Sequence, residues 1–227
     1  MVNPEHRTPY GLTLRLLHLH QASAHISIEA LYATIGELSS RPEYIEPIRK
    51  EIAIVVSKYG WSKTALSEMA RLESFIMETL RLNPTSDLTS SRKATKDYVL
   101  KNGMCIPKGS LVLLPQFAVH MDDEVYPEPT QFQGFRFCAN PSLENAGEPT
   151  NLTHRFTRIR PDFLLFGIGD HACPGRFFAT TSLKIAMAHL IHTYDFKADP
   201  ASPYKYRHDM IEMITDPNFT LLLKARN

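Results

Sequence analysis

Apolar residues recur every three or four positions in four stretches of the chain. This spacing places them on one face of an α-helix, so each stretch is predicted to be a helix that buries one side. The four predicted helices cover residues 12–38, 43–57, 67–82 and 175–194. The first is expected to end at Arg41-Pro42 and the third at Asn83-Pro84, because the residue before a proline avoids helical backbone angles.

Between the third and fourth predicted helices the helical spacing gives way to short segments separated by turn residues. Such segments are typical of short strands. The expected strands cover residues 92–95, 98–100, 104–106 and 111–114, followed near the end of the chain by 210–214 and 219–223. Residues 122–162 lack periodicity and are rich in Pro, Asn, Asp and Glu, so they are predicted to form a long surface segment. The pattern therefore predicts a mainly α fold with small antiparallel β-sheets (α+β).

Composition limits the possible functions. The chain has 227 residues, 43% of them hydrophobic, and a formal net charge of +1. It is long enough to bury a core as one domain, and it lacks the charge excess that would indicate nucleic acid binding. No apolar run has the length of a membrane span, and the first residues contain neither a secretory core nor an anchor. Cys105, Cys138 and Cys173 are far apart, which argues against a disulfide framework or a zinc site and favours a reducing compartment.

Cys173 lies in the stretch 166–179, which reads FGIGDHACPGRFFA and leads into the fourth predicted helix. The start of a helix offers unpaired backbone N–H groups and the positive end of the peptide dipoles, and both stabilise a thiolate. Phe166 can shield the sulfur from water, and His171 can donate a hydrogen bond to an acidic group at the rim of a ligand. The stretch therefore predicts a thiolate site. The alternative is a structural cysteine buried in a Gly-Pro turn.

Three glycines close to this cysteine favour the thiolate site. Gly167, Gly169 and Gly175 permit positive φ, and without side chains they let a flat ligand approach the backbone closely. A buried structural cysteine would leave these glycines without an explanation.

Glu78 and Arg81 are three residues apart in the third predicted helix, so their side chains share a face. Many helices carry such a pair as a solvated surface contact of little energetic value. The neighbours of this pair are mostly apolar, which indicates that it is buried, and a buried pair needs further hydrogen bonds to offset its desolvation. Arg136 is a candidate to supply them.

Together these patterns resemble the cytochrome P450 family of heme-thiolate monooxygenases. The stretch around Cys173 meets every fixed position of the pattern F-x-x-G-x-x-x-C-x-G-x-x-x-A, and Glu78, Arg81 and Arg136 match the E-x-x-R pair and its later arginine. The resemblance implies that Cys173 is the proximal ligand of the iron of heme b, where a thiolate favours cleavage of the O–O bond. It also implies that Glu78, Arg81 and Arg136 are structural residues of the core.

The resemblance implies further contacts with heme. Phe166, Gly167 and Gly175 belong to the same cysteine loop and are expected to bind the cofactor. Arg92 matches the position of an arginine that pairs with a heme propionate, and His171 would do the same from the other side. A solvent-facing strand residue is the alternative for Arg92.

The first predicted helix departs from the family pattern. The family places an acid or amide and then a threonine in the middle of this helix, where they relay protons. This chain has Ile26 at the position of the first threonine. Ser27 could substitute through a water molecule, and His25 could donate a proton near neutral pH, so both are candidate catalytic residues. A helix histidine without a catalytic role is the alternative for His25.

The resemblance covers about residues 12–223 and implies that 1–227 is a single partial domain, the C-terminal half of the cytochrome P450 fold. The N-terminal half, which carries the membrane anchor in the family, is expected to be absent. The implied activity is oxidation of a small organic substrate by O2, with an NADPH-dependent reductase as the electron donor. Basic residues flank the cysteine loop and are expected to form a surface that attracts an acidic reductase: Arg155, Arg158, Arg160, Arg176 and Lys184. Surface charge without a partner is the alternative for these residues. Similarity to fungal members indicates secondary-metabolite biosynthesis, including terpenoids.

Two alternatives to this monooxygenase stay open. One is a truncated, non-catalytic remnant that binds heme or has only a structural role. The other keeps the heme and carries out isomerase or peroxide-driven chemistry, for which Ile26 would matter less. The location stays unknown from the sequence, with the cytoplasm and the periphery of the endoplasmic reticulum as the two alternatives that the resemblance suggests.

Overall fold

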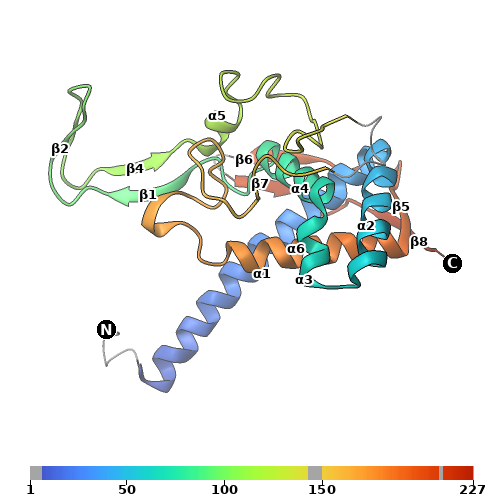
Figure 1. Cartoon of the computed structure of the whole chain (residues 1–227). Helices are drawn as coiled ribbons and strands as arrows, with labels where there is room; N and C mark the ends of the chain where they lie inside the picture. The colour runs from blue at the N-terminus through green and yellow to red at the C-terminus, as the bar shows by residue number, and fades with distance from the viewer. Residues whose placement is uncertain (1–6, 143–149, 210–211, 227) are drawn as a thin grey trace.

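The computed structural model describes residues 7–142, 150–209 and 212–226, and within them helices dominate (Figure 1). The α-helices are α1 (Pro9–Ser40), α2 (Ile45–Tyr59), α3 (Lys63–Glu68), α4 (Ala70–Leu82), α5 (Gln116–His120) and α6 (Arg176–Thr193), with 3-10 turns η2 (Pro42–Tyr44) and η3 (Gly169–His171). The predicted α+β class is confirmed. α3 and α5 were not predicted, because five or six residues are too few to give a helical period.

The strands form four antiparallel pairs of two strands each among the described residues. They are β1 (Thr89–Lys93), β2 (Tyr98–Val99), β3 (Cys105–Ile106), β4 (Leu111–Leu114), β5 (Tyr194–Ala198), β6 (Tyr206–Asp209), β7 (Glu212–Thr215) and β8 (Leu221–Ala225). β1 pairs with β4, β2 with β3, β5 with β8 and β6 with β7. The predicted strand 210–214 corresponds to β7, and its first two residues lie outside the described residues. β5 and β6 were missed.

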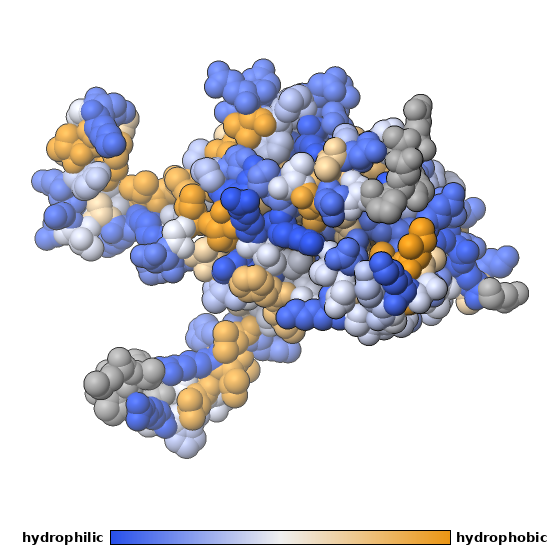
Figure 2. Space-filling model, viewed as in Figure 1, coloured by the Kyte–Doolittle hydropathy of each residue, from blue (hydrophilic) through white to orange (hydrophobic). Residues whose placement is uncertain are grey.

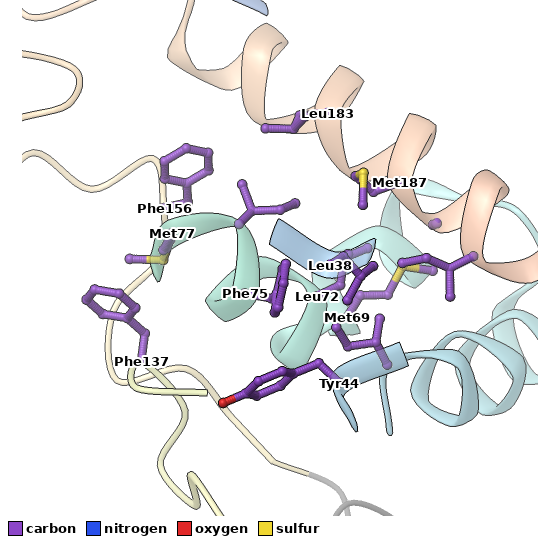
Figure 3. Close-up of a cluster of buried hydrophobic side chains, with 14 of the residues drawn as sticks. Leu38, Tyr44, Met69, Leu72, Phe75, Met77, Phe137, Phe156, Leu183 and Met187 are labelled. Carbon is purple, nitrogen blue, oxygen red and sulfur yellow. The ribbon is translucent and has the colours of Figure 1, made fainter. Parts of the chain in front are cut away.

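α4 is the central helix of the core. It contacts α1, α2 and α6, and twelve of its residues, Ala70 through Arg81, are buried. Figure 3 shows part of this core, with Leu72 and Phe75 of α4 between the α6 helix, which carries Leu183 and Met187, and the ring of Tyr44. Because α4 is buried on all sides, each of its polar side chains needs a partner inside the protein.

The predicted helix 67–82 is divided in the structure: its first two residues belong to the end of α3, and residues 70–82 form α4. The division falls at Met69, whose ψ of 75° is not helical. The first turn of α4 has no capping side chain of its own. Instead, the carboxylate of Glu51 in α2 accepts hydrogen bonds from the backbone N–H groups of Arg71 (2.8 Å) and Leu72 (3.1 Å). A carboxylate from a different helix thus occupies the position of an N-cap.

The N-terminal part of α1 projects from the rest of the molecule (Figure 1). The buried residues of this helix all lie between Ala30 and Ser39. Leu16 and Leu19, which the helical spacing placed on an inward face, are 67% and 66% exposed. Figure 2 shows hydrophobic surface on the projecting part. The expected burial of this stretch is therefore wrong for the described residues, because no described element packs over it.

Candidate functional site

A cavity of about 360 Å³ lies between α1, the start of α6 and the loop that contains Cys173. Its walls are mostly apolar. α1 contributes Leu19, Ala22, Ser23, Ile26, Ser27 and Ala30, and the other walls are formed by Leu80, Thr85, Phe156, Leu165, Phe166, Cys173, Pro174, Gly175, Phe178, Ala179 and Leu183. None of these residues is charged. The cavity therefore suits a mostly apolar molecule that can contact the sulfur of Cys173 or bind it through a metal ion.

Short hydrogen bonds fix the loop that carries the sulfur. The N–H of Cys173 donates to the carbonyl of Phe166 at 2.8 Å, and the N–H of Gly167 donates to the carbonyl of Leu164 at 2.8 Å. The helix α6 begins at Arg176, so Cys173 lies just before the helix rather than in its first turn. The guanidinium of Arg176 donates to the carbonyl of Cys173 at 2.9 Å.

The three glycines of the loop have two different roles. Gly167 and Gly169 adopt φ of +69° and +72°, as the prediction required. Gly175 is different, because its φ is −82°, so the expected need for positive φ is wrong at this position. A methyl group on Gly175 would lie 3.8 Å from the sulfur of Cys173. Gly175 thus contributes by leaving the space beside the sulfur free of a side chain.

The structure brings four of the predicted site residues to the cavity wall. Cys173, Phe166 and Gly175 come from the loop, and Ser27 comes from α1. Ile26, which stands in place of the family threonine, also lines the wall. Residues about 150 positions apart in the sequence therefore share one cavity.

Among the described residues, the other predicted site residues lie off this wall. His25 is two positions before Ser27, and side chains two apart on a helix diverge; its Nε2 lies 3.2 Å from the carboxylate of Glu29. His171 is exposed in η3, and Arg92 is exposed on β1, where it donates to the neighbouring carbonyl of Ser91 at 2.7 Å. Gly167 is buried beside β1, and a methyl group there would lie 3.2 Å from Oγ of Ser90.

Glu78, Arg81 and Arg136 form one buried cluster. Nε and Nη2 of Arg81 donate to the two carboxylate oxygens of Glu78 at 2.8 and 2.9 Å, and neither side chain is exposed. Nε of Arg136 lies 3.1 Å from both of these oxygens. The N–H of Gln133 donates to the same carboxylate at 2.9 Å. Five hydrogen bonds to one carboxylate offset the cost of burying its charge.

Lys184 is a second buried charge, and the sequence interpretation placed it on a basic surface around the cysteine loop. That placement is wrong. Lys184 is 3% exposed and its ammonium group pairs with Glu73 of α4. The other carboxylate oxygen of Glu73 accepts the N–H of Phe156 at 2.8 Å. Since Phe156 lines the cavity, this pair helps to hold a cavity wall in place.

His120 at the end of α5 was not predicted as a site residue. Its ring is buried between α4 and the segment that leads to the cysteine loop. Burial lowers the pKa of His120 to about 4, so the imidazole is neutral at neutral pH. A single histidine with no periodic pattern around it gives no signal in the sequence that it is buried or neutral.

The described residues contain no group of three or more His, Cys, Asp or Glu side chains that could hold a metal ion. Within the same residues, none of the helices combines the length and apolar character required to cross a bilayer. A single thiol in an apolar wall is thus the metal-ligating group that the cavity offers.

The chain belongs to the cytochrome P450 family. The family model described as Cytochrome P450 matches residues 12–222. This match includes the cysteine loop, the Glu78 cluster and the part of α1 that lines the cavity.

Relatives from filamentous fungi agree with this assignment. The chain is 36% identical over 207 residues to cytochrome P450 monooxygenase paxQ of Penicillium paxilli, covering 89% of this chain and 39% of the relative. It is 37% identical over 224 residues to cytochrome P450 monooxygenase AN1598 of Emericella nidulans, covering 96% and 40%. Cytochrome P450 monooxygenase hepE of Aspergillus oryzae is 34% identical over 220 residues, covering 97% and 39%. The chain thus spans about two fifths of the length of these relatives.

Proposed function

We propose that this chain is the cysteine-bearing part of a heme-thiolate monooxygenase that oxidises a small organic substrate. The observation that carries the proposal is the placement of Cys173 in the wall of an uncharged, mostly apolar cavity. Membership of the cytochrome P450 family supports heme as the cofactor. We infer heme b in particular, and we regard residues 1–227 as part of one domain of this family.

The residues of the cavity fit a flat macrocycle with an iron atom at its centre. Cys173 supplies the thiolate ligand, Phe166 and Phe178 supply aromatic surface, and Gly175 leaves the space beside the sulfur free of a side chain. Heme, when bound, would supply the activation of O2 from which one oxygen atom reaches the substrate. Arg92 and His171 are both exposed. We propose that their side chains would pair with the propionates of the heme.

The chain's own residues have separate tasks in this function. The hydrogen bond from the N–H of Cys173 to the carbonyl of Phe166 supports the loop, and the ring of Phe166 lines the cavity together with the sulfur. Ser27 lines the cavity from α1 and can pass a proton through its hydroxyl group, which Ile26 cannot do. His25 would have to leave Glu29 before it could donate a proton toward the cavity.

Electrons would come from an NADPH-dependent reductase. Exposed Arg155 and Arg158 lie close in sequence to the cysteine loop, and a basic surface steers an acidic partner. The fungal relatives support a role in secondary metabolism, and we propose a terpenoid among the possible substrates. The apolar cavity wall is compatible with such a substrate.

A reduced, carbon-monoxide-treated sample of the chain with added heme tests the proposal. A Soret band displaced far to the red is expected, because it marks an intact thiolate ligand. Cys173→Ser should abolish this band, whereas Cys105→Ser should retain it, since Cys105 is exposed on β3. If the wild-type chain takes up no heme, the non-catalytic remnant becomes the better account. Consumption of reductant coupled to a hydroxylated product would then separate catalysis from binding.

A further inference from the structure

His120 joins the buried charge cluster to the segment that leads into the cysteine loop. Its side chain is fully buried. The N–H of Leu164 lies 3.1 Å from Nε2 of the ring, and the carbonyl of Arg81 lies 3.2 Å from Nδ1. An amide N–H can only donate and a carbonyl can only accept, so Nε2 is the acceptor and Nδ1 carries the proton. One tautomer therefore satisfies both contacts.

The surroundings of the ring keep it in this neutral form. Phe163 stacks on it, with the ring centroids 5.2 Å apart and the planes 20° from parallel. Nη1 of Arg81 donates to the backbone carbonyl of His120 at 2.6 Å, so a cation already lies beside the residue. Burial has the largest effect and disfavours a second proton, so it lowers the pKa of His120. The hydrogen bond to the carbonyl of Arg81 opposes this effect, the Arg81 cation adds to it, and the carboxylate of Asp162 opposes it least.

Two further hydrogen bonds lead from Leu164 to the cysteine. The carbonyl of Leu164 accepts the N–H of Gly167 at 2.8 Å, and the carbonyl of Phe166 accepts the N–H of Cys173 at 2.8 Å. Together with the bond to His120, these contacts link the end of α4 to the backbone of Cys173. Every residue in this path from Phe163 to Gly167 is at least half-buried. If one of these hydrogen bonds were lost, water would therefore be a poor substitute for the lost partner.

We propose that His120 is a positioning residue that fixes the cysteine loop against the Glu78–Arg81 pair and thereby sets the position of the Cys173 sulfur in the cavity. The proposal rests on the proposed function in so far as the sulfur is a heme ligand. Its geometric part concerns the loop alone and can be tested on the chain without heme.

Two substitutions separate the two hydrogen bonds of the ring. The amide nitrogen of asparagine stands near the position of Nδ1, so His120→Asn keeps the bond to Arg81 and loses the bond to Leu164. The carbonyl oxygen of glutamine stands near the position of Nε2, so His120→Gln keeps the acceptor for Leu164. Both variants remove the aromatic ring, and each is therefore the control for the other.

The first measurement is amide hydrogen exchange at Leu164 in the chain without heme. We expect exchange to be roughly tenfold faster in His120→Asn and to stay within about threefold of wild type in His120→Gln. The second measurement is the rate at which iodoacetamide modifies Cys173, with exposed Cys105 as the internal reference. That rate should rise several-fold in His120→Asn only. Equal rates at Cys173 in the two folded variants would overturn the proposal.

The wild-type chain provides a test that needs no folded variant. If the hydrogen bonds act as one unit, the amides of Leu164, Gly167 and Cys173 should exchange through a single opening in mild denaturant. Exchange at Cys173 through an opening that leaves Leu164 protected would contradict the proposal. With heme added, His120→Gln should retain the red-shifted Soret band and His120→Asn should lose it. Failure of the wild type to bind heme would count against the proposed function, whereas the exchange results would still decide the role of His120.

Discussion

Two hydrogen bonds join the guanidinium group of Arg81 to the carboxylate of Glu78, in a place where neither side chain has any exposed surface. Removing Arg81 would take two of the five hydrogen bonds from the buried carboxylate of Glu78 and would leave the buried carbonyl of His120 without its donor. We expect Arg81→Met to lower the free energy of unfolding by about 3–5 kcal/mol, measured by denaturant titration.

The control for this variant is an exposed ion pair. Nη1 of Arg226 lies 3.3 Å from the carboxylate of Asp195, and both side chains are accessible to solvent. Arg226→Met should therefore cost about 1 kcal/mol or less. Similar losses in the two variants would contradict the structural role of the buried pair.

Glu51 should give the chain a pH-dependent stability whose sign follows from its burial. Burial raises the pKa of this carboxyl group from 4.5 to about 7, although the N–H groups of Arg71 and Leu72 act in the opposite direction. The folded protein therefore holds the proton more tightly than the unfolded chain. The resulting stabilisation is complete below pH 4.5 and is lost as the pH rises to 7. The difference between the folded and unfolded pKa values corresponds to about 3 kcal/mol of stability.

Glu51→Gln should flatten this part of the pH profile. Denaturant titrations at several values between pH 4.5 and 7.5 would measure the slope, and Glu43→Gln, an exposed carboxylate near the start of α2, is the control. His120 adds a slope of opposite sign, since its lowered pKa gives stability that is present above pH 6.5 and is lost as the pH falls through 4. The slope from His120 is the same in the wild type, in Glu51→Gln and in Glu43→Gln, so it does not affect the comparison. An unchanged profile in Glu51→Gln would show that the carboxyl group does not titrate in this range.

Gly167 and Gly169 are a matched pair for testing the cysteine loop. Both have left-handed backbone angles, so alanine at either position should cost about 1–2 kcal/mol in backbone strain. A methyl group on Gly169 would meet open space, whereas one on Gly167 would lie 3.2 Å from Oγ of Ser90. Gly167→Ala should therefore lower the midpoint of chemical unfolding more than Gly169→Ala. Equal midpoints would mean that β1 adjusts to the loop without cost.

Ile26 should limit the coupling of electron use to product formation. It lines the cavity where a hydroxyl group would help to pass protons. In an active preparation, we expect Ile26→Thr to raise the fraction of reductant that ends in hydroxylated product. Ile28→Thr makes the same change on an exposed face of α1 and should have no effect on this fraction. No gain in Ile26→Thr would remove this account of the position.

Much of the fold could be predicted from local patterns. The periods of α2, α4 and α6 were visible because each helix places a continuous apolar stripe on the core. β5 was missed because it continues directly from α6, with Tyr194 following Thr193 and no turn residue between them. The split between α3 and α4 was missed for a different reason. It depends on Glu51, which is distant in sequence and carries no local signal.

The site shows the same division. Cys173 and its glycines could be recognised because backbone angles and close approach restrict the residue types that fit. The contacts of Lys184 and His120 depend on segments that meet only in the folded chain. Local spacing can reveal a partner on the same helix, as for Glu78 and Arg81, but it cannot reveal one on a distant segment. Lys184 was therefore expected at the surface, and His120 was not considered.

The cap that α2 provides for α4 also affects the order of folding. A helix of thirteen residues is marginal alone, and the first N–H groups of α4 find their acceptors on Glu51 only after α2 has docked. A synthetic peptide of α4 should accordingly be mostly unstructured in water. The central helix of this chain is thus expected to form together with its neighbour, as one cooperative event rather than as a preformed nucleus.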